Sequence, residues 1–331
     1  MKLNFDPKSN ITAFDNVAMK LKKMRQRIDD LLVVRSVVKN WQDIFLFRVG
    51  MKKAGFVMRL RNGKNIKINK PEDYFDFWNT ENAQRALLNY VGLKEKIKID
   101  KHQKIIKSKL LDKPIYLIYD SDKQLANTIC MIKEQFIEEQ YKWLNVKGKE
   151  VIDIGANIGD SAIYFASNGA KRVYAFEPYP YSYNIANNNI GLNELQDKIT
   201  LINQGCGGKE TTIKIGSNYE NFGGTDLKSF KSGKEMKITT LNEIIKKFNI
   251  EYPEILKIDC EGCEYEVLLK ANNSDLKKFK QIQIEYHYGY LNLKRKLEEA
   301  GFKVKRSFPK HSLDMDAENK DMLLGWIYAE T

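Results

Sequence analysis

The chain has 331 residues, a net charge of +12 and 43% hydrophobic residues, enough for a substantial core and for more than one domain. Its longest apolar runs are far too short to span a bilayer, and its first residues lack the apolar run of a secretory signal. Four cysteines in a chain of this length do not make a disulfide framework. We therefore expect a cytoplasmic protein without a transmembrane segment.

The charge is distributed unevenly along the chain. Residues 1–150 carry 31 Lys and Arg against 18 Asp and Glu, a net charge of +13, whereas the remaining residues carry a net charge of −1. This asymmetry indicates either an acidic partner for the N-terminal half or a simple compositional bias. The acidic partners to consider are nucleic acid, an anionic membrane surface and a phosphorylated substrate.

Residues 1–145 are predicted to form a basic N-terminal α+β region. Residues 12–49 have helical spacing, and around residues 20–32 apolar side chains oppose a row of lysines and arginines. Such a basic amphipathic helix either contacts a membrane surface peripherally or packs on its own domain. Asn62-Gly63 between two apolar runs predicts a β-hairpin. Further along, we expect a helix in 71–92, short strands in 94–113, a strand at 115–119 and a helix at 129–144.

The clearest pattern in the sequence runs from Val151 to Pro178. An apolar strand (residues 151–154) leads into a glycine turn, a helix that Asp160 or Ser161 could cap, and a second strand that ends in Glu177. In such a βαβ unit the loop lets the backbone approach a nucleotide, and the acid accepts hydrogen bonds from ribose hydroxyls. The alternative interpretation is a glycine turn in a sheet that binds no nucleotide.

The glycine spacing distinguishes between two classes of cofactor. The pattern is Asp153-x-Gly155-x-Asn157-x-Gly159, not the G-x-G-x-x-G of dinucleotide sites. An acid two residues before the first glycine suits a cationic ligand that carries an amino acid, such as S-adenosylmethionine, which has no phosphate to place. The spacing therefore favours S-adenosylmethionine over a dinucleotide.

Strands and helices continue to alternate after Glu177, which predicts a doubly wound α/β sheet in a domain of residues 146–331. Predicted strands end at or near 203, 259 and 285, and two closing strands follow around 301–302 and 322–328. A hairpin-like insertion is predicted from 211–215 and 236–239. Ligands of such sheets bind beyond the carboxyl ends of the strands. The residues expected to ring one crevice there are Asp153, Glu177, Asn203, Asp259 and Glu285.

Three blocks of sequence, DIGANIGDSAIYFA with AFEP, LKIDCEGCEYEVL and IEYHY, resemble the FkbM family of S-adenosylmethionine-dependent methyltransferases over roughly residues 134–330. The resemblance implies a Rossmann-like, seven-stranded class I methyltransferase sheet, here with an N-terminal α+β extension. Members are largely associated with O-methylation of hydroxyls on sugars and small natural products. The implied cofactor is S-adenosylmethionine, and the resemblance also implies that Asp259 and Glu261 lie near the transferred methyl. The predicted cofactor site comprises Asp153, Gly155, Ala156, Asn157, Gly159, Asp160, Glu177, Pro178 and Asn203.

Methyl transfer to an alcohol needs a group that takes the hydroxyl proton. The candidates for this catalytic role are Asp259, Glu261, Glu285 and His287. His287 titrates nearest neutrality and shares a strand face with Glu285, or it is a structural histidine in an aromatic cluster. We predict no metal, although a divalent ion could sit among these acids. The C-x-x-C of Cys260 and Cys263 is interpreted as incidental.

The sequence thus predicts a methyltransferase of class EC 2.1.1 whose acceptor is a hydroxyl on a glycan, glycolipid or small metabolite. One alternative is an RNA methyltransferase that binds phosphates through the basic N-terminal half. Against it, the fourth strand of the sheet leads into Asp259-Cys260-Glu261-Gly262 and not an Asn/Asp-Pro-Pro-aromatic block. The other alternative is a non-catalytic scaffold with a relic fold. The acceptor, the catalytic base, the oligomeric state and the role of residues 1–130 do not follow from the sequence.

Overall fold

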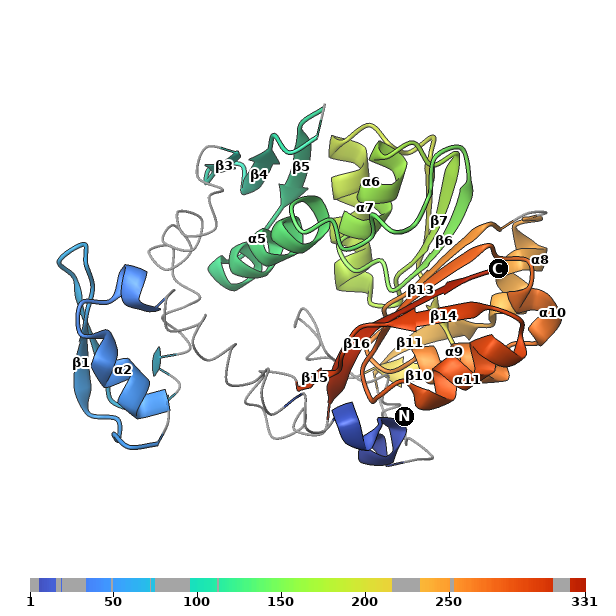
Figure 1. The fold of residues 1–331 in the computed structure, drawn as a ribbon. Coiled ribbons are helices and arrows are strands. Elements are labelled where there is room, and N and C mark those ends of the chain that lie inside the picture. Colours follow the sequence, from blue (N-terminus) through green and yellow to red (C-terminus); the bar gives the residue numbers. More distant parts are fainter. Residues whose placement is uncertain are drawn as a thin grey trace. The chain divides into compact units, whose positions relative to one another are not determined.

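A computed structural model describes residues 6–15, 19, 34–48, 50–71, 73–74, 96–111, 113–215, 233–250, 253–311 and 322–331. The chain divides into two compact units, one of Met1–Met19 with Glu134–Thr331 and one of Lys20–Lys133. The first 19 residues therefore belong with the C-terminal part of the chain, whereas the sequence places a domain boundary after residue 145. Each unit has its own strands (Figure 1).

The unit of residues 20–133 contains the predicted hairpin. Strands β1 (Phe56–Arg59) and β2 (Asn65–Ile68) pair antiparallel around Asn62-Gly63. Helix α2 (Trp41–Arg48) contributes Ile44 to the small core of this hairpin. The basic amphipathic helix predicted around 20–32 and most of the helix predicted at 71–92 lie outside the described residues.

Three further strands of this unit form an antiparallel sheet where strands were predicted: β3 (Ile97–Asp100), β4 (Ile105–Ser108) and β5 (Ile115–Ile118). Helix α5 (Asp122–Phe136) follows. It begins seven residues before the predicted helix at 129–144 and ends at Phe136, because the chain turns at Glu139, whose φ is +47°. The predicted extension to 144 is therefore wrong.

The other unit is built on one large sheet. Its strands are β6 (Glu150–Ile154), β7 (Arg172–Phe176), β8 (Ile199–Ile202), β12 (Ile255–Ile258), β13 (Gln281–Tyr286), β14 (Lys303–Arg306) and β16 (Leu323–Glu330). Their order across the sheet is β8-β7-β6-β12-β13-β16-β14, and the short β15 (Lys310–His311) also pairs with β16. The first five run parallel, and β16 is antiparallel to both neighbours. This arrangement confirms the predicted seven-stranded class I methyltransferase sheet.

Helices cover both faces of this sheet (Figure 1). Helices α6 (Asp160–Ser167) and α7 (Pro180–Leu192) pack beside β7 and β8. On the opposite face, α8 (Leu241–Lys247), α9 (Glu264–Lys270) and α11 (Leu291–Glu299) bury their apolar sides against one core, and α10 (Asn273–Leu276) follows α9. Successive side chains of each strand point to opposite faces of the sheet. One face therefore supplies the aliphatic residues of this core: Ile152, Ile154, Leu256, Ile258, Ile282 and Ile284.

A smaller three-stranded sheet lies between β8 and β12 in the chain. Strands β10 (Thr211–Ile215) and β11 (Lys234–Thr239) form the predicted hairpin, and β11 also pairs with the short β9 (Gly205–Cys206). The hydroxyl of Thr240 accepts a hydrogen bond from the backbone N–H of Glu243 and so caps the N-terminus of α8. By contrast, Gly159 precedes α6 as its N-cap and Asp160 is already its first residue, which corrects the predicted cap.

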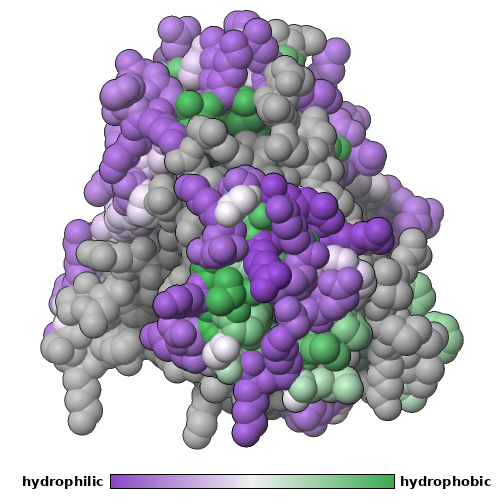
Figure 2. All heavy atoms as spheres, turned by 90° about the vertical axis from the view of Figure 1, so that its left-hand side faces the viewer, coloured by the Kyte–Doolittle hydropathy of each residue, from purple (hydrophilic) through white to green (hydrophobic). Residues whose placement is uncertain are grey.

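Hydrophilic side chains cover most of the described surface that Figure 2 shows, with hydrophobic ones in small separate patches. Large hydrophobic side chains that are exposed include Phe45 on α2 and Val57 on β1. None of the described helices is both long and apolar enough to cross a membrane.

A buried ion pair stands at the centre of the large sheet, on the face that carries α6. Lys257 is only 1% exposed, and its Nζ lies 3.0 Å from Oδ1 of Asp153 on the neighbouring strand. Burial alone would lower the pKa of Lys257, but the carboxylates of Asp153 and Asp259 outweigh burial and raise it. The lysine is therefore charged and holds β6 and β12 together.

Removing this cation should cost much more stability than removing one on the surface. Lys257→Met leaves the buried carboxylate of Asp153 without its charge partner, so we expect a loss of about 3–5 kcal/mol in the free energy of unfolding. Lys280→Met removes a 65% exposed lysine paired with Glu254 at 3.0 Å and should cost less than about 1 kcal/mol. Urea unfolding of both variants is the measurement, and equal losses would contradict the assignment.

Candidate functional site

The glycine loop after β6 packs directly on the end of β12. Gly155 has φ +83°, and a Cβ at this position would lie 1.7 Å from the backbone oxygen of Asp259. No side chain fits there, so only glycine allows this approach. The Nζ of Lys257 also donates a hydrogen bond to the Gly155 oxygen at 2.7 Å. The loop and Asp259 are thereby held side by side where the strand order reverses.

Glu177 closes β7 with a buried carboxylate that is 5% exposed. The backbone N–H of Asn157 donates to its Oε2 at 2.8 Å, and that of Tyr179 donates to its Oε1 at 2.9 Å. Burial raises the pKa of Glu177 to about 8, although these two hydrogen bonds lower it. Each carboxylate oxygen retains a free lone pair for a ligand hydroxyl. The group is fixed at the loop, as expected for an acid that binds ribose.

Asp153 and Asp160 are buried beside this loop. The carboxylate of Asp153 bonds to Lys257 and accepts a hydrogen bond from the Ser161 hydroxyl at 2.7 Å. It is fully buried and has partners inside the protein, so its geometry suits positioning better than the direct ligand contact expected from the sequence. Burial raises the pKa of Asp160 to about 7.

The remaining predicted cofactor residues shape the loop and the end of β7. Ala156 is buried, Asn157 has φ +47°, and Gly159 has φ +84°. The side-chain amide of Asn203 donates to the backbone oxygens of Glu177 and Pro178 at 2.9 and 3.0 Å. These bonds hold the turn that follows β7.

The predicted catalytic residues meet around the imidazole of His287, which is 3% exposed. Its Nε2 lies 3.1 Å from Oε2 of Glu261 and 4.0 Å from Oδ1 of Asp259. Its Nδ1 lies 2.9 Å from Oε1 of the fully buried Glu264. Burial alone would lower the pKa of His287, but Glu261 and Glu264 outweigh it and hold the pKa well above its usual value. The imidazole is therefore a cation that holds three acids in place.

Glu261 reaches His287 from a tight turn after β12. Its φ is +55°, a left-handed conformation that costs a residue with a side chain on the order of 1 kcal/mol. Cys260 and Cys263 form a disulfide across this turn, with 5.4 Å between their Cα atoms. The prediction that these cysteines are incidental is thus wrong, because they close the turn that presents Glu261.

Asp259 and Glu285 complete the cluster. The side chain of Asp259 is 24% exposed, so a ligand can reach it. Burial raises the pKa of Asp259 and also raises the pKa of Glu285, which the Asp259 charge raises further. One atom each from Asp259, Glu285 and His287 lies within 4.8 Å of the others, a spacing that suits a divalent cation, although His287 would have to lose a proton to coordinate one. That the site holds no metal stays a prediction.

Two members of the site do not follow from our sequence reasoning, although both lie in the block LKIDCEGCEYEVL. Lys257 interrupts an apolar strand, which is itself a signal because a fully buried lysine needs a charged partner. Glu264 is the last acid of the pattern KID-x-EG-x-E at residues 257–264. The backbone N–H groups that its carboxylate binds are evident only in the structure. Besides His287, it accepts a hydrogen bond from the N–H of Gly262 at 2.8 Å.

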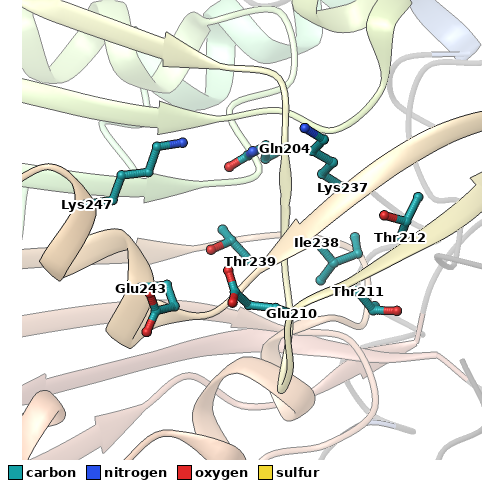
Figure 3. A pocket seen from close by; sticks show the side chains of 9 residues that line it. All are labelled: Gln204, Glu210, Thr211, Thr212, Lys237, Ile238, Thr239, Glu243 and Lys247. Carbon is teal, nitrogen blue, oxygen red and sulfur yellow. The ribbon is translucent and has the colours of Figure 1, made fainter.

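A separate polar pocket of about 530 Å³ lies beside the small sheet (Figure 3). Side chains from the end of β8, from β10, β11 and α8 line it: Gln204, Glu210, Thr211, Thr212, Lys237, Ile238, Thr239, Glu243 and Lys247. We call Asp259, Glu261, Glu264 and Glu285, which surround His287, the acidic cluster. None of these residues lines the polar pocket, so we place the chemistry at the acidic cluster.

Comparison with known proteins places this site in a family. Residues 153–304 match the family described as "Methyltransferase FkbM domain". Over 168 residues the chain is 30% identical to uncharacterized protein 158B of Sulfolobus islandicus rod-shaped virus 1, covering 50% of this chain and 77% of that protein. It is 23% identical to hexuronic acid methyltransferase AglP of Haloferax volcanii over 49% of this chain and 62% of that protein.

The similarity covers only part of some relatives. The chain is 24% identical to AMB antimetabolite synthetase AmbE of Pseudomonas aeruginosa over 49% of its own length, but this spans only 10% of AmbE. The activity of such a larger protein therefore does not transfer as a whole.

The charge state of His287 is a direct test of the cluster. Glu264→Gln removes one of the two carboxylates that raise the pKa of His287, so this pKa should fall. NMR titration of the imidazole resonances measures it, and the sequence contains only three histidines. Glu266→Gln, two residues along the same helix, is the control and should leave the pKa unchanged. A pKa that is equal in all three proteins would contradict the geometry.

Proposed function

Because the chain belongs to the FkbM methyltransferase family, we propose that it transfers a methyl group from S-adenosylmethionine to a hydroxyl of a sugar, glycolipid or small metabolite. The observation that carries this proposal is the cluster of Asp259, Glu261 and Glu285 around His287, next to the glycine loop. The relative named hexuronic acid methyltransferase fits an acceptor with sugar hydroxyls.

The residues around the loop fit the cofactor. Glu177 presents two fixed carboxylate oxygens that can accept hydrogen bonds from ribose hydroxyls. Because Gly155 has no side chain and adopts a left-handed backbone conformation, the loop can pack against the end of β12. When bound, S-adenosylmethionine supplies an electrophilic methyl group on a cationic sulfonium.

The charge of the cluster suits such a cationic group. Four carboxylates, Asp259, Glu261, Glu264 and Glu285, share this region with the cations of His287 and Lys257. The acidic groups outnumber the cations, and a positive charge nearby would lower the raised pKa values of Asp259 and Glu285 and so favour their ionised forms. A positive ligand charge nearby is therefore favoured over a negative one.

We assign the general base to Asp259. The Nε2 of His287 is 3.1 Å from Glu261 but 4.0 Å from Asp259, so Glu261 is engaged by the imidazolium and Asp259 is less tightly paired. Its partial exposure allows an acceptor hydroxyl to reach it, and its raised pKa makes it a stronger base than an ordinary aspartate. The hydroxyl proton goes to this carboxylate, while the charge on His287 keeps Glu261 and Glu264 in position.

Loss of the base should abolish turnover and spare the cofactor. For Asp259→Asn we expect methyl transfer to fall by about 10²–10⁴-fold, with the affinity for S-adenosylmethionine within a few-fold of the wild type. The assay is transfer of labelled methyl into glycan and lipid, small-molecule, RNA and protein fractions of host extract. Asp197→Asn, an exposed residue of the same unit, is the control.

The fraction that takes the label decides between the acceptors. Label in the glycan, lipid or small-molecule fraction that disappears with Asp259→Asn supports the proposal. Label in RNA would contradict the proposed acceptor, and an Asp259→Asn enzyme as active as Asp197→Asn would contradict the proposed base.

Glu177 should couple cofactor binding to pH. Its pKa is about 8 in the free protein because burial raises it, with Asp153 raising and Lys257 lowering it as well. Ribose hydroxyls donate hydrogen bonds to the ionised carboxylate and so lower this pKa, which means that binding near pH 7 releases protons. Affinity should then rise with pH, by up to about tenfold per unit, and level off above pH 8.

Isothermal titration calorimetry in buffers of different ionisation enthalpy measures this proton release. Glu177→Gln is the control, because it retains the size of the side chain but cannot titrate. A proton count that is the same for wild type and variant would contradict the expected ionisation of Glu177 on cofactor binding.

A further inference from the structure

The beginning of the chain lies against the loop that carries His287. This N-terminal segment, residues 7–15, lies far outside the matched domain of residues 153–304 yet belongs to the same compact unit. It opens with the 3-10 helix η1 (Pro7–Asn10). The loop against which it packs, residues 287–290, follows β13.

Asn10 makes most of the contacts between the segment and the loop. It is 5% exposed, and its Nδ2 donates to the backbone oxygen of Tyr288 and to Oδ1 of Asn292, both at 3.0 Å. In return, its Oδ1 accepts the N–H of Asn292 at 3.0 Å, and its backbone oxygen accepts the N–H of Tyr290 at 2.9 Å. One residue is thus bonded to three positions within five residues of His287.

Asp15 fixes the other end of the segment. It is fully buried and accepts a hydrogen bond from the hydroxyl of Tyr290 at 2.7 Å. Its other oxygen lies 2.9 Å from the guanidinium of Arg306. Burial alone would raise the pKa of Asp15, but the hydrogen bonds from Thr12 and Tyr290 and the charge of Arg306 outweigh it, so the carboxyl is ionised beside the guanidinium.

The loop is held between this segment and α9. On the α9 side, the hydroxyl of Tyr265 donates to the Gly289 oxygen at 2.6 Å and accepts the N–H of Tyr288 at 2.8 Å. On the other side Asn10 approaches so closely that a Cβ on Gly289 would lie 2.6 Å from its backbone oxygen. The third partner of the loop is Leu323 of β16, whose N–H donates to the His287 oxygen at 2.8 Å and whose oxygen accepts from the Gly289 N–H at 3.1 Å. Of the three, only α9 belongs to the matched domain.

We propose that Asn10 is a positioning residue of the reaction site, through which the N-terminal segment holds the loop of His287 in its catalytic geometry. This inference rests on the proposed function, since it gives the segment a role in methyl transfer. It also implies that the matched domain alone is an incomplete enzyme. Without the bonds of Asn10, the backbone of Tyr288 loses its outer partner and His287 can shift relative to Glu261 and Asp259.

The test compares Asn10→Ala with Ser9→Ala. Ser9 is the exposed neighbour whose hydroxyl donates to the nearby Asp6 oxygen at 2.7 Å and not to the loop, so it is a matched control. For Asn10→Ala we expect kcat to fall about tenfold or more, because small displacements in a reaction site are costly, with the affinity for S-adenosylmethionine unchanged. The imidazole resonances of His287 should shift in Asn10→Ala and not in Ser9→Ala.

Three outcomes separate this inference from its alternatives. Unchanged kcat and unchanged His287 resonances in Asn10→Ala would overturn it. A parallel loss of kcat, cofactor affinity and folded protein would also overturn it, because the segment would then be merely structural. Should Asn10→Ala not fold, Asn10→Asp is the second variant, because it keeps the acceptor for Asn292 and loses both donor bonds. This variant must also lower kcat while leaving the affinity for S-adenosylmethionine unchanged.

Failure of the proposed function is distinguishable from failure of this inference. A wild-type protein that binds S-adenosylmethionine but methylates no fraction of the extract argues against the function. The NMR comparison of Asn10→Ala with Ser9→Ala still measures the position of His287 in that case, and a shift supports the positioning role.

Discussion

The buried ammonium of Lys257 is the interaction on which both the sheet and the site depend. It joins β12 to Asp153 on β6 and to the backbone of the glycine loop, so the two strands at the point where the strand order reverses share one cation. The hydroxyl of Tyr141, buried and without a hydrogen-bond partner among the described residues, belongs to the same region, and the nearby acids raise its pKa beyond the effect of burial. The pairing of β6 with β12 and the position of the glycine loop therefore both depend on the charge of Lys257 and of the acids around it.

The fold of the large unit follows from the sequence because its signals are local and repeated. Apolar strands of four to six residues alternate with helices, and glycines or capping residues mark the junctions. Since parallel strands end at one edge of the sheet, placing Asp259 and Glu285 at the ends of two strands was enough to expect them near one another. Glu261 and His287 follow those two residues by two positions each and lie in the same cluster. Residues 216–232 and the first basic helix lie outside the described residues, so the prediction of that helix stays a prediction.

The parts that the sequence did not predict depend on contacts between distant residues or on burial. No periodic signal connects Asn10 with Tyr288, because their pairing spans 278 residues and involves backbone oxygens. Asp153 looked like a ligand for a cationic cofactor, and only its full burial beside Lys257 shows that its partners lie inside the protein. The charge on His287 likewise comes from Glu261 and Glu264, and the side chain of Glu264 contacts the imidazole only in the folded chain.

In the proposed function, the cofactor and the acidic cluster share one crevice at the carboxyl ends of β6, β7 and β12. A crystal structure of the protein with S-adenosylhomocysteine tests it most directly. We expect ribose hydroxyls within hydrogen-bond distance of Glu177 and the sulfur on the side of Asp259. Ligand bound in the polar pocket around Lys237 and Lys247, or with its sulfur turned away from Asp259, would contradict the account.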